Sequence, residues 1–188
     1  MRRSEIVVKS CGFLPRFFSR HPFRRPSKYA KIKDNRMEKR FAVRRVKPSD
    51  IPAILEIETA SFGPDAYDRK LFAEYTRNCG ELFLVALEGT RVVGYAITCL
   101  CAAKSGIRAE LVSLAVHPTV LGKGAAPALM ESILRRLKLR RVSRFGLTVK
   151  VMNTRAIGFY KKYGFRRLRR VPRYYEDGAD GFLFVKDL

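Results

Sequence analysis

The stretch SLAVHPTVLGKGAAPALMESILRRL, residues 113–137, restricts the fold more than any other, because an apolar strand pattern runs through a glycine-bearing turn directly into a helical pattern. Gly122 and Gly124 stand at the expected helix entrance, although glycine costs about 1 kcal/mol relative to alanine inside a helix. Free N–H groups and the positive dipole end of such a helix bind anions, and Lys123 can add a cation. A phosphate held against the turn therefore explains the glycines, and a tight turn that needs glycine only for its geometry explains them as well.

The rest of the chain alternates strand and helix patterns in the order βααβββαβαββ. Residues 82–100 predict two strands joined by a turn at 88–90, and a polar loop is expected after them. Gly164 is expected to end the last helix. This order predicts an α/β sheet with a parallel strand pair around the glycine-bearing turn. The other expected elements are strands over 41–47, 109–116, 145–151, 165–171 and 181–188, helices over 48–62, capped by Ser49 or Asp50, over 68–78 and over 153–163, and a helix with the apolar stripe Leu129, Met130, Ile133 and Leu137.

Length and composition indicate one globular domain. The chain has 188 residues, 47% of them hydrophobic, which is enough for one well-buried core and too few for two comfortable domains. No stretch approaches the roughly 20 apolar residues that span a bilayer, so we expect a soluble protein. The cysteines follow no zinc-ligand spacing, so we expect no metal site. We expect buried free thiols in a reducing compartment, with Cys99 and Cys101 on one face of a strand; the other two are Cys11 and Cys79.

Charge divides the chain into two parts. Residues 1–40 carry 13 of the 39 basic and 3 of the 17 acidic side chains of a protein whose net charge is +22. This segment has no sustained period and is expected to be a disordered basic arm. A charge of this size attracts polyanions such as nucleic acid, ribosomes, anionic lipid or a phosphorylated cofactor. The arm resembles a transit peptide, and a nucleic-acid-binding tail or an upstream extension of a domain that begins at Met37 are the alternatives. We expect a cytoplasmic protein, or an organellar one if the arm is a transit peptide.

A second motif, NTRAIGFYKKYGF at residues 153–165, follows the glycine-bearing turn. Together with LAVHPTVLGKGAAPALM it resembles the GNAT family of N-acetyltransferases, whose hallmarks are a Q/R-x-x-G-x-G/A loop and an N-x-x-A-x-x-F/Y-Y-x-x-x-G-F segment. The resemblance covers residues 41–188 and implies a mixed, mostly antiparallel sheet with a splayed parallel strand pair and flanking helices. The run VPRYYEDGADGFLF is similar to the bacterial ribosomal-protein alanine acetyltransferases and the eukaryotic N-terminal acetyltransferases.

The resemblance implies that acetyl-CoA lies between the two splayed strands. The backbone of Leu114, Ala115 and Val116 would bind the pantetheine. Asn153 matches the family asparagine that contacts CoA, and Tyr160 matches the tyrosine beside the thioester sulfur, where a phenol can protonate the departing thiolate. A helix-cap role for Asn153 and core packing for Tyr160 are the alternatives. The pyrophosphate would contact the loop formed by Gly122, Lys123, Gly124, Ala125, Ala126 and Pro127.

Two positions depart from the family pattern. Leu121 stands where the loop usually begins with Gln or Arg, which removes one polar contact to phosphate. Thr148 stands where the ribosomal alanine acetyltransferases carry a glutamate, and threonine is no base at neutral pH. Glu110 has the placement of the catalytic glutamate in the histone-acetylating branch of the family, so we expect it to be the base; an ion pair with a basic neighbour such as Arg108 is the alternative. His117, in the loop after the strand, is a weaker candidate.

The acceptor side is suggested by two segments. In the N-terminal acetyltransferases, the loop between the first two helices and a tyrosine pair near the last hairpin hold the peptide. SFGPDAYD and RYYEDG occupy those places here, and their candidates for acceptor binding are Phe62, Pro64, Tyr67, Tyr174 and Tyr175; aromatic packing is the alternative reading. The basic segment 161–173 has seven cations in thirteen residues, which suits a solvated strand face or a contact with ribosomal RNA or an acidic peptide.

The function that these residues predict is acetyl-CoA-dependent transfer of an acetyl group to a protein or peptide N-terminal amine. Such an amine has a pKa near 8 and needs only modest help to lose its proton. One alternative keeps the chemistry but changes the acceptor to a small amine or a lysine side chain. The other is a polyanion-binding or ribosome-binding protein of the same fold with weak catalysis. The acceptor sequence and the oligomeric state are left open.

Overall fold

The computed structural model of the protein describes residues 40–103 and 106–188. In this part of the chain, seven strands form one sheet in the order β1-β2-β3-β4-β5-β7-β6. The expected element order and the mixed α/β fold are confirmed. The elements are β1 (Ala42–Arg45), α1 (Ile51–Phe62), α2 (Arg69–Asn78), β2 (Phe83–Glu88), β3 (Arg91–Ala103), β4 (Gly106–Val116), α3 (Ala125–Leu139), β5 (Arg144–Lys150), α4 (Thr154–Lys162), β6 (Arg166–Val171) and β7 (Gly181–Asp187).

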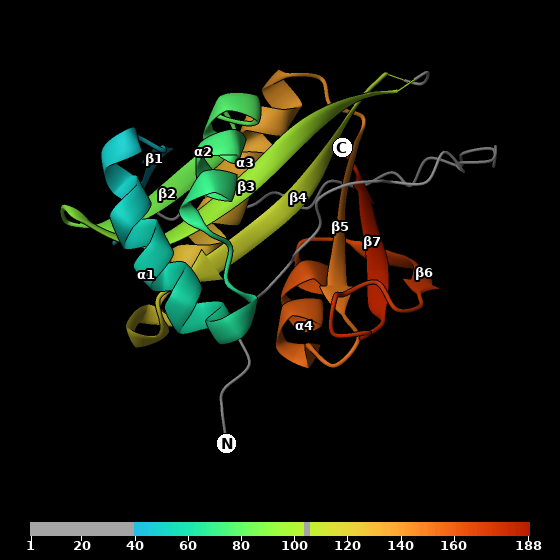
Figure 1. Ribbon diagram of the computed structural model, residues 1–188. Helices are drawn as coiled ribbons and strands as arrows, with labels where there is room; N and C mark the ends of the chain where they lie inside the picture. Colours follow the sequence, from blue (N-terminus) through green and yellow to red (C-terminus); the bar gives the residue numbers. More distant parts are fainter. Residues whose placement is uncertain (1–39, 104–105) are drawn as a thin grey trace.

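Helices cover both faces of the strands β2 to β4 (Figure 1). Because side chains alternate along a strand, Leu84 and Ala86 of β2 join a core with α3, whereas Phe83 and Val85 join a second core with α1 and α2. The strand is therefore apolar at nearly every position. The core on the α3 side continues through α4 and β5, so it connects the two halves of the sheet.

The parallel strands β4 and β5 pair only over a short distance. Arg108, Ala109 and Glu110 lie opposite residues 144–146, and β4 then continues to Val116 without β5 as its neighbour. Figure 1 shows the two strands diverging from this point, with α4 beside β5. On its other side, β5 remains paired with β7 along its whole length. The expected splayed parallel pair is present, and its divergence begins directly after Glu110.

The prediction of a polar loop directly after residue 100 is wrong. β3 continues to Ala103 and β4 begins at Gly106, so the two strands form one long hairpin. The paired ends of β3 and β4 project beyond the helices (Figure 1), and none of residues 100–103 and 106–108 is fully buried. The register shifts where Ile97 faces Ser113 but the next residue, Thr98, faces Leu111. Val112 is the additional residue of this β-bulge, which bends β4 just after Glu110.

The cysteines differ from the expectation of free thiols. Cys79, at the C-terminal end of α2, and Cys99, on β3, form a disulfide with Cα atoms 4.9 Å apart. The fold brings them together because α2 lies over β3, which no local pattern in the sequence reports. Cys101 is a half-buried free thiol, and burial, followed by the nearby Glu110 carboxylate, raises its pKa. Cys11 lies outside the described residues.

The start of the domain is fixed by a carboxylate with an unexpected role. Asp50 immediately precedes α1, as predicted, but its side chain caps no helix N–H. It accepts two hydrogen bonds from Arg44, at 2.6 and 2.8 Å, and one from the Lys47 amide at 2.7 Å. These bonds connect β1 to α1. The expected arm, residues 1–40, lies outside the described residues except for Arg40, which pairs with Glu88.

No helix among the described residues is both long and apolar enough to cross a membrane.

Candidate active site

The loop between β4 and α3 has a backbone that glycine adopts readily. Gly122 has φ +77° and Gly124 has φ +105°, both in a region that residues with a side chain rarely enter. A Cβ added at Gly122 would meet nothing within 4 Å, and one at Gly124 would lie 3.8 Å from the Phe41 ring. The backbone at Gly122 is therefore open to approach. Leu121 packs against the core, which explains an apolar residue at this position.

The first turn of α3 directs donors toward this loop. Gly124 is the N-cap of the helix, and its carbonyl accepts from the Ala128 amide at 3.0 Å. The amides of Ala125 and Ala126 fall in the first turn, where N–H groups have no acceptor within the helix. Pro127 has no N–H to satisfy, and Lys123 is exposed beside the helix end. Donors, dipole and cation together form a site that suits a phosphate.

The carboxyl-terminal half of β4 forms one edge of the divergence. Leu114, Ala115 and Val116 are buried and pair with β3 through residues 94–96. Their side facing β5 has no strand partner, since the β4–β5 pairing ends at Glu110. An extended ligand can add its polar groups to such a strand edge. The three residues predicted to bind the pantetheine therefore lie on a strand edge to which an extended ligand can add its polar groups.

Two candidates come from α4. Asn153 is the N-cap of the helix, and its Oδ1 accepts from the Ala156 amide at 3.0 Å, so the cap role is confirmed. Tyr160 is fully buried, with its ring 5.4 Å from that of Phe159 and 5.7 Å from that of Phe165. Among the described residues, its hydroxyl has no hydrogen-bond partner. Burial raises the pKa of Tyr160 well above its ordinary value, with a smaller contribution from Tyr175.

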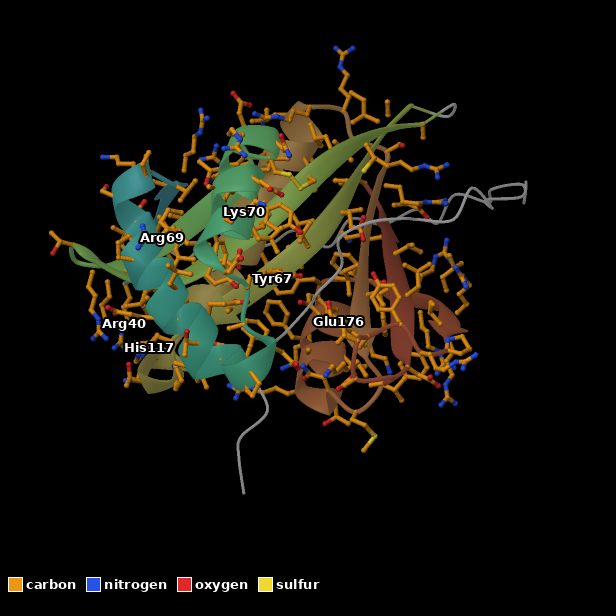
Figure 2. All side chains as sticks on the ribbon, in the orientation of Figure 1. Arg40, Tyr67, Arg69, Lys70, His117 and Glu176 are labelled. Atoms are coloured by element: carbon orange, nitrogen blue, oxygen red, sulfur yellow. A yellow bond between two sulfur atoms is a disulfide. The ribbon has the colours of Figure 1, made fainter. Side chains whose placement is uncertain are left out.

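The two predicted acceptor segments meet across the end of β5. Phe62 ends α1, Pro64 lies in the short turn that follows, and Tyr67 precedes α2. Lys150, the last residue of β5, pairs with Asp65 of this loop at 3.6 Å and with Asp177 of the β6–β7 turn at 2.6 Å. Figure 2 labels one residue of each segment, Tyr67 before α2 and Glu176 in the β6–β7 turn.

The tyrosine pair belongs to this junction. The rings of Tyr174 and Tyr175 are 5.1 Å apart and nearly perpendicular. Tyr175 is buried, its hydroxyl donates to the Thr148 carbonyl at 3.3 Å, and the Lys150 ammonium lies 5.1 Å from the centre of its ring. Burial raises the pKa of Tyr175, and the neighbouring Tyr174 and Tyr67 raise it further. The ion pairs of Lys150 thus join the loop that carries Tyr67 to the turn that follows the tyrosine pair.

The candidate bases occupy different environments. Glu110 is half-buried on β4 at the start of the divergence, opposite Cys99 on β3. Thr148 is buried in β5 against β7, where its Cγ2 would lie 2.6 Å from a Cβ added at Gly181. His117 stabilises the turn after β4, since its Nδ1 accepts from the Thr119 amide at 3.3 Å. Of these three candidates, Glu110 is the carboxylate beside the point where the strands diverge, and its role as a base stays a prediction.

Glu58 is a carboxylate of this region that was not predicted from the sequence. Glu58 of α1 is fully buried, and its Oε1 accepts from the Tyr67 amide at 2.9 Å. Its Oε2 accepts from the Tyr95 hydroxyl, which lies 3.0 Å from the Ser113 hydroxyl on β4. A signal was available, because Glu58 falls four residues after Ile54 on the apolar face of an amphipathic helix. A charged residue at that spacing indicates a buried polar contact.

Comparison with known proteins agrees with this geometry. The model of the Acetyltransferase (GNAT) family matches residues 51–165. An N-alpha-acetyltransferase of Sulfolobus acidocaldarius is 30% identical over 165 residues, which cover 82% of this chain and 97% of the relative. The crystal structure of Ard1 from Thermoplasma volcanium has a TM-score of 0.74 at 26% identity, covering 79% of this chain and 98% of that one.

A third similarity concerns the bacterial branch. The ribosomal-protein-S18-alanine N-acetyltransferase from Escherichia coli has a TM-score of 0.67 at 26% identity, with 78% of this chain and 93% of that chain covered. The family match spans the glycine-bearing loop, β5 and α4, which are the parts that form the divergence between the strands. With its sequence, its fold and this site in agreement, the chain belongs to the GNAT family of acetyltransferases.

Proposed function

We propose that the protein transfers the acetyl group of acetyl-CoA to the N-terminal amine of a protein or peptide. The observation that carries the proposal is the divergence of β4 and β5 after Glu110, which leaves the β4 edge without a strand partner between the loop at Gly122 and the tyrosines of the acceptor segments. The relatives named N-alpha-acetyltransferase support the choice of a protein N-terminus as acceptor.

Three features of the chain fit acetyl-CoA. The backbone at Gly122 is open, the first turn of α3 presents amide donors, and the buried Tyr160 hydroxyl lacks a partner among residues 40–103 and 106–188. We assign Gly122 to Pro127 to the pyrophosphate, Leu114, Ala115 and Val116 to the pantetheine, and Asn153 to a further CoA contact. The bound thioester would supply an activated acetyl group.

Two side chains of the protein then accept and donate protons. We assign Glu110 as the base that accepts a proton from the attacking amine, directly or through water, because it lies where the strands begin to diverge. Tyr160 donates its proton to the thiolate that leaves when the C–S bond breaks and the N–C bond forms. Its raised pKa keeps that proton in place before the reaction. Backbone amides polarise the thioester carbonyl.

The acceptor would enter between the α1–α2 loop and the β6–β7 turn. Phe62, Pro64 and Tyr67 line one side and Tyr174 and Tyr175 the other. Lys150 connects the two sides through its ion pairs with acidic residues of both loops. This closed arrangement suits a single extended chain end better than a side chain presented from a folded surface, which favours an N-terminal amine over a lysine.

Calorimetry of the full chain with acetyl-CoA tests the proposal first. We expect binding by the wild type and loss of binding in Gly122→Asp, because a carboxylate would stand where the phosphate approaches. Gly89→Asp is the matched control, since Gly89 also has positive φ, +62°, and nothing within 4 Å of an added Cβ. Absence of binding by the folded wild type would contradict the assignment of the cofactor loop.

Acetyl transfer to peptides separates the acceptor classes. A set of peptides with free N-termini, and the same peptides with blocked N-termini and an internal lysine, would be incubated with enzyme and acetyl-CoA. We expect mass spectrometry to find the acetyl group only on the free N-terminal amines. Acetylation confined to lysine or to small polyamines would contradict the proposed acceptor and leave the enzyme class intact.

A second property rests on the basic segment 161–173. We propose that it contacts RNA, as on a ribosome, while the enzyme acts in the cytoplasm, or in an organelle if the arm is a transit peptide. Every residue of β6 except the last is exposed, and the strand lies at the edge of the sheet. Arg166 and Arg170 pair with acidic residues, whereas Arg167 and Arg169 form no ion pair with any described residue. The Arg167 guanidinium lies 4.8 Å from the centre of the Phe182 ring, so a phosphate that binds either arginine displaces no carboxylate of the described residues.

A further inference from the structure

We propose that Glu58 is a positioning residue for acceptor binding, which holds the α1–α2 loop at Tyr67 in a fixed place relative to β4 at Ser113. The inference rests on the proposed N-terminal acetylation and adds a residue that acts through others. Glu58 is completely buried, as are Tyr95 and Ser113, so this connection runs through the interior of the core that carries α1 and α2.

The donors and acceptors in this connection have one consistent direction. The Tyr67 amide can only donate, so Oε1 of Glu58 accepts from it at 2.9 Å. The Tyr95 hydroxyl donates to Oε2 of the same carboxylate. Because the Tyr95 O–H proton is used in the hydrogen bond to Glu58, the Tyr95 oxygen accepts from the Ser113 hydroxyl at 3.0 Å. The chain of donors therefore runs from Ser113 through Tyr95 to the carboxyl group of Glu58, and each of its two oxygens accepts a hydrogen bond.

The two ends of this chain lie at the two substrates. Tyr67 belongs to the predicted acceptor loop, which Lys150 joins to the β6–β7 turn through its ion pairs with Asp65 and Asp177. Ser113 lies beside the bulge residue Val112 and directly precedes the segment assigned to the pantetheine. A carboxylate that joins these points fixes the distance between acceptor loop and donor strand. Buried hydrogen bonds are strong enough for this, because losing one leaves a buried polar group unpaired.

The test compares three variants of the full-length enzyme. Glu58→Met keeps the length of the side chain but removes both acceptor atoms, so the Tyr67 amide loses its partner. Glu58→Gln keeps Oε1 for Tyr67, while its amide N–H can donate to Tyr95. Glu56→Gln is the matched control, because Glu56 carries the same group on the same helix but is exposed.

In Glu58→Met we expect the KM for an N-terminal peptide to rise at least about tenfold, because the Tyr67 amide is left as a buried donor without an acceptor. The Kd for acetyl-CoA should stay within about twofold of the wild type, since no assigned contact to it is removed. Hydrogen exchange at the Tyr67 amide should become at least about tenfold faster. Glu58→Gln should change both measurements less, and Glu56→Gln should change neither.

The opposite results would overturn the inference. A Glu58→Met enzyme with lower Tm but wild-type KM and wild-type exchange at Tyr67 would show a purely structural role. If this variant does not fold, Tyr95→Phe decides, because it breaks the chain while keeping the Tyr67 contact. We expect it to raise the peptide KM without accelerating exchange at Tyr67, and an unchanged KM would overturn the inference.

Failure of the proposed function would look different. A wild type that acetylates no N-terminal peptide would reject that function by itself. Exchange at the Tyr67 amide would still report the positioning of the loop, because it needs no activity. Faster exchange in Glu58→Met would then uphold the positioning, and unchanged exchange would overturn it.

Discussion

Tyr160 is the residue whose chemistry can be isolated most cleanly. Its hydroxyl is buried and has no partner in the described part of the chain, so removing that oxygen costs no hydrogen bond in the free enzyme. Tyr160→Phe should leave the ring contacts with Phe159 and Phe165 intact and should not lower Tm. As the acid, the phenol should be worth about a hundredfold in kcat. Steady-state kinetics and calorimetry would show a lower kcat with an unchanged Kd for acetyl-CoA.

The raised pKa of Tyr160 gives this prediction a pH dependence. Because burial holds the pKa well above 10, the group stays protonated throughout the range in which the enzyme is assayed. The wild-type kcat should therefore not decline between about pH 7 and pH 9.5 through loss of this proton. An alkaline decline in this range that is absent from Tyr160→Phe would contradict the assigned role.

Asp50 offers a prediction about stability and pH. Hydrogen bonds from Arg44 lower its pKa most, and the Lys47 amide and the Arg44 charge add to this against the effect of burial. A lowered folded pKa stabilises the protein above the unfolded value of about 3.9 and loses this contribution as the pH falls through the folded value. Urea unfolding of Asp50→Asn should show a loss of about 2 kcal/mol at pH 7, with the difference from wild type shrinking below pH 4. Equal stability at pH 7 would show that the pair contributes nothing.

At this scale, what the sequence could predict depended on local spacing. Gly122, Gly124 and Asn153 were found because a turn and a helix cap follow from neighbours in the chain, and the structure places them accordingly. Glu58 and Tyr95 are 37 residues apart, and no short pattern connects them. The roles of Glu110 and Tyr160 stay predictions, since they depend on substrates.

Among the elements, α2 is held by a covalent bond that periodicity could not predict. The Cys79–Cys99 disulfide joins its C-terminal end to β3 across 20 residues of sequence. Closing a loop of this length stabilises a fold by about 3 kcal/mol through the unfolded chain. The double variant Cys79→Ser, Cys99→Ser should therefore have a free energy of unfolding lower by about 3 kcal/mol and a lower urea midpoint. Dithiothreitol should shift the wild type to the same midpoint.

The free thiol provides the control for the disulfide. Cys101→Ser changes the same atom two residues along β3, on the same strand face, and should leave the midpoint nearly unchanged. Alkylation of the unfolded, unreduced protein should label neither Cys79 nor Cys99. A wild-type midpoint that does not respond to dithiothreitol, or full labelling of both residues, would contradict the bond.

The order of elements was predictable because each has its own period, whereas their exact lengths depended on pairing. α4 ends before Gly164, whose φ of +79° no continuing helix would take, as expected. The long β3–β4 hairpin was missed because none of residues 101–103 and 106–108 is fully buried, so these strand ends carry no apolar pattern. Backbone pairing between strands, rather than side-chain burial, extends both of them there.

For the whole molecule, the arrangement of charge separates two functions that the sequence alone left as rivals. The junction of the acceptor segments contains Asp65, Asp177 and a single lysine that bridges them. Four exposed arginines lie instead on β6, at the far edge of the sheet, where β7 separates them from β5: Arg166, Arg167, Arg169 and Arg170. A polyanion can therefore occupy the basic segment while a peptide occupies the site. Binding of RNA and catalysis need not exclude each other.

This separation predicts how binding to RNA should respond to salt and to mutation. Each phosphate contact that is lost should reduce the slope of log K against log salt by about one. In filter binding of a structureless RNA to the full chain, Arg167→Gln together with Arg169→Gln should lower the slope by about two and leave the kinetics of peptide acetylation unchanged. The charge-matched control is Arg77→Gln with Arg91→Gln, two exposed arginines remote from β6. If both pairs reduce the slope equally, the charge of the molecule attracts RNA without a defined surface, and the assignment to β6 is wrong.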